Sequence, residues 1–141
     1  MTTSIVTVDA LLVADGQVLM IRRAKEPFMD RLAFPGGHVE EGEELLAATV
    51  RELEEEVGIV LEPQRLEYLI RLDATGRDPR PGHDLSHVFY AQVDADLLRS
   101  GEAASDAKSV HVVKLSELTA DDCAFDHFSA IERMREVLGA D

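Results

Sequence analysis

The sequence of 141 residues contains a single cysteine, Cys123, and no tryptophan. One cysteine excludes a disulfide within the chain, so the sequence favours a reducing, cytoplasmic compartment and a buried, apolar role for Cys123. Basic residues are also scarce, because 14 Lys and Arg stand against 28 Asp and Glu, a formal net charge of −14. This balance disfavours nucleic-acid polymers and anionic membranes as partners, since both are bound through an excess of cationic side chains.

Long apolar runs are missing as well. The first apolar stretch, SIVTVDALLV, is interrupted by Asp9 and is not preceded by basic residues, so we expect neither a signal peptide nor a membrane span. Hydrophobic residues nevertheless make up 45% of the chain, which is enough for a core. The length predicts one domain over residues 1–141.

Strand-like and helix-like patterns alternate along the chain. β-Branched residues predict five strands, and Asp15-Gly16 predicts that the first two form a hairpin. Apolar residues at helical spacing predict two helices, the first ended by Gly58 and the second with Asp126 as a candidate N-cap. The predicted strands are 4–13, 17–23, 65–72, 86–93 and 109–115, and the predicted helices are 43–57 and 126–139. Segment 24–37 is expected to be irregular, 73–85 a turn-rich loop and 95–108 a polar connection. This order favours an α/β fold in which helices flank a mixed sheet.

The first predicted helix carries carboxylates on one flank. Glu52, Glu55 and Glu56 are three or four residues apart, so they share a flank that is separate from the apolar stripe. Like charges at these spacings destabilise a helix, and a divalent cation relieves the repulsion. Carboxylate oxygens suit Mg²⁺ or Mn²⁺, and the sequence has no Cys/His cluster typical of zinc sites. An acidic run alone is more often a solvated face, but the Gly36-Gly37 pair and Arg51 favour a ligand site.

Residues 37–59 read G-x5-E-x7-R-E-L-x-E-E-x-G-I, which resembles the signature of the Nudix hydrolases at each restricted position. The resemblance implies the family's α/β/α sandwich and the hydrolysis of a nucleoside diphosphate linked to another moiety, with Mg²⁺ or Mn²⁺. Its implied catalytic residues are Glu43, Arg51, Glu52, Glu55 and Glu56. Of these, Glu43 and Arg51 brace the loop against the helix. The implied metal ligands are Glu52, Glu55, Glu56 and the carbonyl oxygen of Gly36.

Two further stretches bear on the substrate. The loop GRDPRPGHDL resembles the RDPRG loop of ADP-ribose pyrophosphatases in this family, and CAFDH resembles the LAFDH that opens their last helix. Arg77 and Arg80 of the first stretch would suit a phosphate or the terminal ribose, because a guanidinium offers paired donors. Pro81 departs from the pattern, because it separates Arg80 from Gly82 and could displace the arginines.

Arg22 and Arg23 end a predicted strand near the acidic helix and are candidate phosphate contacts. Neighbouring strand residues face opposite sides, so we expect one of the two to point into the cleft. Among the histidines, His38 is expected to be polar surface and His127 to pack against or cap the last helix. No ligand spacing joins His83, His87 and His111.

A second departure concerns the general base. One stretch of the family usually carries an acidic residue. This stretch is similar to SDAKSVHVVKL in the present chain, where Ser109 occupies the acidic position. A serine cannot act as a base unaided. The candidates for the missing carboxylate are therefore Asp106, Glu102 and the glutamates of the helix.

The sequence thus predicts a Mg²⁺-dependent enzyme that converts ADP-ribose to AMP and ribose 5-phosphate. Two alternatives stay open. One is a Nudix hydrolase of another nucleotide, such as a nucleoside triphosphate, a dinucleotide or a nucleotide sugar. The other is a non-catalytic sensor that binds ADP-ribose. The resemblance also allows a homodimer, which ADP-ribose members of the family often form.

Overall fold

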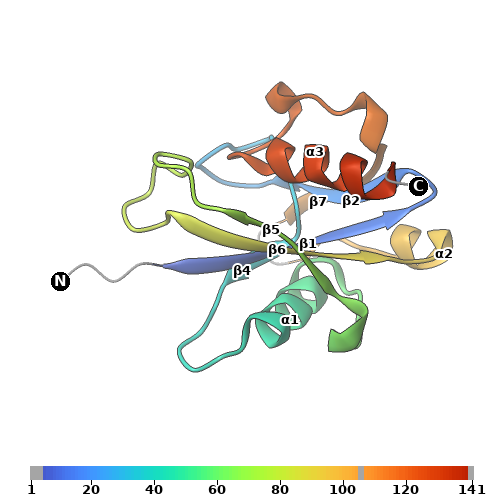
Figure 1. Cartoon of the computed structure of the whole chain (residues 1–141), viewed down its shortest axis with the longest axis horizontal. Helices are drawn as coiled ribbons and strands as arrows, with labels where there is room; N and C mark the ends of the chain where they lie inside the picture. Colours follow the sequence, from blue (N-terminus) through green and yellow to red (C-terminus); the bar gives the residue numbers. More distant parts are fainter. Residues whose placement is uncertain (1–4, 105–106, 140–141) are drawn as a thin grey trace.

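The computed structural model describes residues 5–104 and 107–139. Figure 1 shows a central sheet with α1 against one face and α3 against the other. The strands are β1 (Val6–Ala14), β2 (Gln17–Arg23), β3 (Leu32–Ala33), β4 (Gly36–His38), β5 (Glu67–Leu72), β6 (Leu85–Gln92) and β7 (Ala107–Lys114). The helices are α1 (Leu45–Val57), α2 (Ala95–Arg99) and α3 (His127–Leu138), with short 3-10 turns η1 (Pro63–Arg65), η2 (Leu115–Glu117) and η3 (Ala120–Asp122).

The sheet is mixed, as predicted. β1 pairs in parallel with β6 along its length and antiparallel with β2 and β4. The spatial order of the main path is β3-β2-β1-β6-β5, with β7 added to β2. The hairpin between β1 and β2 turns at Asp15 and Gly16. Both residues have positive φ angles, as a two-residue type I′ turn requires.

Two layers of core form on the two faces of the sheet because side chains alternate along β1. Val8 and Leu12 pack with Leu53 of α1 in one cluster. Leu11 packs with Ile131 of α3 in the other. The predicted α/β/α sandwich is therefore confirmed.

The boundaries of the predicted elements differ from the structure in a few places. The first helix begins at Leu45 and not at Glu43, because the Glu43 side chain accepts a hydrogen bond from the Glu40 backbone N–H ahead of the helix. It ends at Gly58 as predicted, in the left-handed conformation. The short elements β3, β4 and α2 lie outside the predicted helices and strands.

Asp126 occupies the N-cap position of α3 but does not cap the helix. Its carboxylate instead accepts a hydrogen bond from Arg77 Nε at 2.8 Å. The predicted N-cap position of Asp126 is therefore confirmed, but its side chain makes no capping hydrogen bond because a distant arginine takes the carboxylate. The burial predicted for Cys123 is confirmed. No helix within residues 5–104 and 107–139 combines the length and apolar character needed to cross a membrane.

Replacing Leu53 tests how strongly its packing fixes α1 against the sheet. It is fully buried between the helix and the sheet, so we expect Leu53→Ala to lower the free energy of unfolding by about 2–5 kcal/mol. Urea denaturation measures this change. The control is Val60→Ala, just past the helix and largely exposed, for which we expect a change within about 0.5 kcal/mol. Equal losses in the two variants would contradict this packing.

Candidate active site

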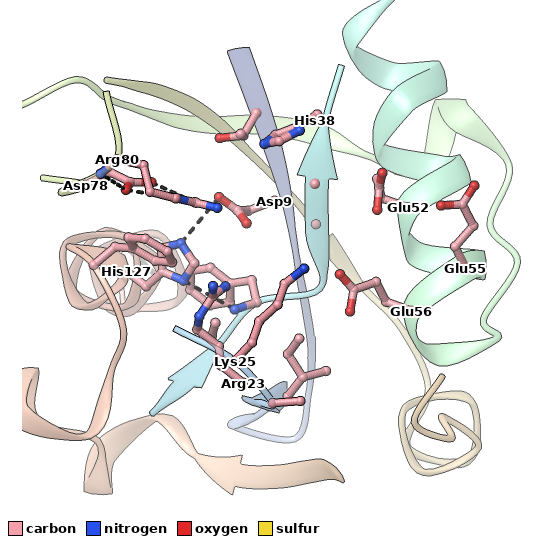
Figure 2. A pocket seen from close by; sticks show the side chains of 18 of the residues that line it. Asp9, Arg23, Lys25, His38, Glu52, Glu55, Glu56, Asp78, Arg80 and His127 are labelled. Carbon is pink, nitrogen blue, oxygen red and sulfur yellow. Dashed lines mark hydrogen bonds and ion pairs between the residues drawn. The ribbon is translucent and has the colours of Figure 1, made fainter. Parts of the chain in front are cut away.

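A cavity of about 450 Å³ lies beside the carboxylate flank of α1. Glu52, Glu55 and Glu56 of this helix line one wall, and Figure 2 shows their side chains extending from the same flank. Glu56 is buried, with 8% of its surface exposed. The three glutamates thus share one flank, as the spacing predicted, and this flank adjoins the buried residues Ala48 and Thr49 of the helix.

The Gly36-Gly37 pair lets the backbone of β4 pass close to this wall. β4 pairs with β1 so that Gly36 lies opposite Asp9 and Gly37 opposite Val8. A Cβ atom on Gly37 would lie 2.5 Å from the carboxylate carbon of Glu52, and one on Gly36 would collide with the Val8 carbonyl oxygen. A side chain at Gly36 would collide with the backbone of β1, whereas a side chain at Gly37 would displace the Glu52 carboxylate.

Arg51 connects the loop that precedes α1 to the helix itself. Its Nε and Nη2 atoms donate to the two carboxylate oxygens of Glu43 at 2.8 and 2.9 Å. Nη2 also donates to the His38 carbonyl oxygen at 3.0 Å, and Nη1 donates to Glu52 at 2.9 Å. The hydrogen bonds from Arg51, and one from the Glu40 backbone, lower the pKa of Glu43 to about 2. Glu43 and Arg51 therefore form the brace that the sequence resemblance implied.

Three arginines line another part of the cavity. Arg23, Arg77 and Arg80 have their guanidinium carbons 4.9, 5.6 and 5.6 Å from the ring centre of Phe125. Figure 2 shows Arg23 and Arg80 across the cavity from the glutamates. Burial and the charge of Arg80 lower the pKa of Arg23. The aromatic ring attracts each cation, and this attraction offsets part of their mutual repulsion.

The two stretches that bear on the substrate meet at this cluster. Arg77 is buried and bonds to Asp126 of the CAFDH stretch, 49 positions away. Arg80 is held by Asp78 through contacts of 3.1 and 2.7 Å. Both arginines line the cavity. Arg80 thus reaches the cavity despite Pro81, the residue that departs from the expected pattern.

The comparisons with known proteins agree with this geometry. The family model described as NUDIX domain matches residues 3–134. The chain belongs to the Nudix family. It is 37% identical to an ADP-ribose pyrophosphatase from Methanocaldococcus jannaschii over 127 residues, which cover 90% of this chain and 70% of that protein.

Two solved Nudix structures resemble the whole chain. The NUDIX domain of Shewanella oneidensis NrtR complexed with ADP ribose has a TM-score of 0.84 and 27% identity, covering 98% of this chain and 90% of that one. A bifunctional NMN adenylyltransferase/ADP ribose pyrophosphatase from Francisella tularensis, complexed with AMP and a Mn ion, has a TM-score of 0.80 and 30% identity. It covers 98% of this chain and 42% of that one. The predicted family, fold and hydrolase class are confirmed.

Nudix hydrolases use divalent metals, and the donor atoms of the carboxylate wall suit such ions. The oxygens of Glu52, Glu55 and Glu56, with the Gly36 carbonyl, are hard ligands of the kind that Mg²⁺ and Mn²⁺ prefer. As the side chains stand, no group of three or more His, Cys, Asp or Glu in residues 5–104 and 107–139 is arranged to hold an ion. Half of the Glu55 side chain is exposed, and its carboxylate accepts hydrogen bonds from Arg51.

Of the two arginines that end β2, Arg23 lines the cavity and Arg22 does not. Arg22 lies on the other side of β2, and its Nη1 donates to the Asp30 carbonyl oxygen at 2.6 Å. Strand alternation explains the difference, because consecutive side chains point to opposite faces. The structure therefore does not bring Arg22 to the other predicted site residues.

Ser109, where a Nudix acid was expected, also lies away from the cavity lining. Its hydroxyl is 2.7 Å from His111 Nε2 on the same strand. Glu102 is exposed and contacts the end of α1 through its backbone, since its N–H donates to the Val57 carbonyl. Asp106 lies outside the described residues. Of the candidate bases in the described residues, the glutamates of α1 are the ones that line the cavity.

Sequence reasoning missed Asp9, a buried carboxylate that lines the cavity from β1. Ser86 Oγ donates to it at 2.5 Å, and His127 Nε2 lies 3.4 Å away. His127 Nδ1 accepts from the Phe34 backbone N–H, so Nε2 carries the proton. Burial would raise the pKa of Asp9, but His127, Ser86 and Arg77 together lower it. A lone aspartate inside a buried strand was the signal that could have identified this residue.

The brace between Glu43 and Arg51 predicts a pH dependence of stability. The folded protein holds the pKa of Glu43 at about 2, below its ordinary value of 4.5. The contribution of Glu43 is therefore complete above about pH 4.5 and is lost as the pH falls toward 2. We expect Glu43→Gln to be less stable than wild type at neutral pH, by a margin that shrinks below about pH 4.5.

Urea denaturation at a series of pH values measures the margin between these two proteins. The matched control is Glu41→Gln, an exposed neighbour in the same loop, whose stability we expect to follow that of wild type at every pH. A margin for Glu43→Gln that stays constant as the solution is acidified would contradict the ionic brace.

Proposed function

We propose that this Nudix protein hydrolyses ADP-ribose to AMP and ribose 5-phosphate with Mg²⁺ or Mn²⁺. The observation that carries the proposal is one cavity with glutamates on one wall and Arg23, Arg77 and Arg80 on another. A diphosphate is the ligand class that suits both walls, because a cation joins it to the carboxylates and the guanidiniums bind its oxygens directly. The similarity to an ADP-ribose pyrophosphatase and to a domain complexed with ADP ribose supports this choice.

The local charge explains how a chain of net charge −14 binds an anion. Arg77 and Arg80 are both paired with aspartates, through contacts at 2.8 and 2.7 Å. These pairs hold the guanidiniums in place, and the donors not used by Asp126 and Asp78 are available to phosphate oxygens. The cavity volume of about 450 Å³ lies in the range of small-ligand sites.

The candidate metal ligands are Glu52, Glu55, Glu56 and the Gly36 carbonyl oxygen. A bound Mg²⁺ or Mn²⁺ supplies neutralisation of the diphosphate oxygens and a lower pKa for the attacking water. The neighbour complexed with AMP and a Mn ion supports this choice of metal.

The reaction joins water to one phosphorus and releases the other phosphate. A bond forms between the water oxygen and phosphorus, the bridging P–O bond breaks, and a carboxylate takes the water proton. We assign the proton acceptor to the glutamates of α1, because they line the cavity and Ser109 does not. A cytoplasmic location and a homodimer remain predictions from the sequence.

Product analysis of the purified chain tests this function. The panel is ADP-ribose, a nucleoside triphosphate, a dinucleotide and a nucleotide sugar, each with Mg²⁺ and then Mn²⁺. We expect AMP and ribose 5-phosphate from ADP-ribose, at a kcat/KM about 10-fold or more above the other substrates. Glu56→Gln should reduce turnover by about 10²-fold or more. The matched control Glu54→Gln, on the exposed face of α1, should retain wild-type turnover.

The other results each identify a different error. Cleavage of another nucleotide with ADP-ribose untouched would mean that the substrate assignment is wrong while the hydrolase assignment holds. Tight binding of ADP-ribose without cleavage, by wild type and Glu56→Gln alike, would indicate a sensor. Equal turnover in wild type and Glu56→Gln would remove the carboxylate wall from the mechanism.

Phe125 gives a prediction about substrate affinity. Its ring lies near Arg23, Arg77 and Arg80, and each cation–π contact contributes about 0.5–2 kcal/mol. We expect Phe125→Leu to raise the KM for ADP-ribose about 10-fold, with a smaller change in kcat, because the arginines lose their common support. Steady-state kinetics measure both constants.

The matched control for this variant is Phe128→Leu. Phe128 also lies beside an arginine, Arg135, but it is not part of the cavity lining. We expect its KM to equal that of wild type. A similar KM in all three proteins would show that Phe125 does not organise the arginines for substrate binding.

A further inference from the structure

Two histidines from distant parts of the chain meet at the rim of the cavity. His38 ends β4, and His83 lies in the loop between β5 and β6, 45 positions later. Their Nε2 atoms are 3.2 Å apart, and their ring centres are 5.1 Å apart. His38 also lines the cavity. This pair is separate from the glutamates of α1 and has no role in the reaction described above.

The hydrogen bonding of His83 fixes which nitrogen faces His38. His83 Nδ1 lies 3.1 Å from the Pro81 carbonyl oxygen. A carbonyl can only accept, so Nδ1 carries the hydrogen and donates it. In the neutral ring, Nε2 then presents its lone pair toward His38. Histidines that bind metals commonly have this arrangement, with the other ring N–H donated to a backbone carbonyl.

The spacing of the two nitrogens also fits a shared ion. Imidazole nitrogens bind Zn²⁺ at about 2.0–2.1 Å, so adjacent ligands in octahedral or tetrahedral geometry are about 2.9–3.4 Å apart. The observed 3.2 Å falls within this range. A hydrogen bond from His38 to His83 accounts for the same distance, and a change of the His38 tautomer, in which Nε2 loses its proton and Nδ1 takes one up from water, would free both Nε2 lone pairs for a metal.

We propose that His38 and His83 form a binding site for a borderline divalent transition-metal ion, of the class of Zn²⁺, Ni²⁺, Cu²⁺ and Co²⁺. Paired imidazoles suit these ions, whereas the oxygen donors of the α1 wall suit Mg²⁺ and Mn²⁺. Arg80 and Lys25 bring positive charge near His38, and Asp78, which pairs with Arg80 at 2.7 Å, offsets part of it. Water completes the coordination, because residues 5–104 and 107–139 offer no group of three or more His, Cys, Asp or Glu for an ion.

Binding at this pair would join two segments of the site. His38 follows Gly36 and Gly37, and His83 lies in the loop that carries Arg77 and Arg80. An ion held by both histidines joins β4 to the arginine loop at the rim of the cavity. Because the two ligands are far apart in sequence, the folded protein binds the ion more tightly than the unfolded chain does, and binding stabilises the fold.

Zinc titration of the full chain tests the proposal. In isothermal titration calorimetry, Zn²⁺ is the titrant and an excess of Mg²⁺ is present throughout. Under these conditions the carboxylates of α1 compete poorly for Zn²⁺. We expect wild type to bind one equivalent and His83→Ala to bind about 10-fold or more weakly. The control His111→Ala removes a histidine outside the pair and should bind as wild type does. Zn²⁺ should also raise the melting temperature of wild type by about 3 °C or more, and that of His83→Ala less.

Two further variants make the test independent of folding defects and of the glutamates. His38→Ala should lose the same affinity as His83→Ala, and Glu55→Gln should retain it. Circular dichroism without Zn²⁺ shows whether each variant folds. Wild-type affinity in the folded His83→Ala or His38→Ala variant would overturn the proposal, as would the absence of binding by wild type. Loss of affinity in Glu55→Gln alone would place the ion on α1 and would also overturn it.

Discussion

The guanidinium of Arg51 is the contact on which the geometry of the site depends. It bonds at once to the Glu43 carboxylate, the His38 carbonyl and Glu52. These contacts join the loop before α1, the short strand β4 and the acidic flank of the helix into one unit. Gly36 and Gly37 let β4 approach β1 and the Glu52 carboxylate closely, because neither has a side chain. Arg51, Gly36 and Gly37 therefore position the carboxylate wall.

The wall of the cavity that carries Arg23, Arg77 and Arg80 is stabilised in a different way. Three cations are held close together by an aromatic ring, Phe125, and by the buried pair of Arg77 and Asp126. Phe125 itself has a positive φ angle of 52°, which is uncommon for a residue with a side chain and often marks a functional position. An acidic protein thus places three of its cations around one cavity, across from the glutamates of α1.

The acidic helix and its Nudix pattern could be predicted because helical spacing is local and regular. The strands of the sheet were predicted within a few residues for the same reason. The convergence of Arg77 with Asp126 could not be predicted from local patterns, since the two residues are 49 positions apart. Asp126 has the sequence features of a helix cap, and its true partner is visible only in the fold.

Other failures have equally specific causes. Strands of two or three residues, such as β3 and β4, are too short to show an alternating pattern. The assignment of a site role to Arg22 as well as Arg23 left open which side of β2 faces the cavity. Ser109 was aligned by sequence to an acidic position, but its strand lies beyond β2 and away from the cavity. In each case the missing information was the position of a neighbouring element.

The central claim is that a diphosphate lies between the glutamates of α1 and the arginines near Phe125. A crystal structure of the chain with Mn²⁺ and a non-hydrolysable ADP-ribose analogue tests it most directly, because Mn²⁺ is located by its anomalous scattering. The account predicts Mn²⁺ bound by Glu52 and Glu56, with diphosphate oxygens contacting both the ion and Arg77 or Arg80. A diphosphate bound outside this cavity, or one that contacts neither the ion nor these arginines, would contradict it.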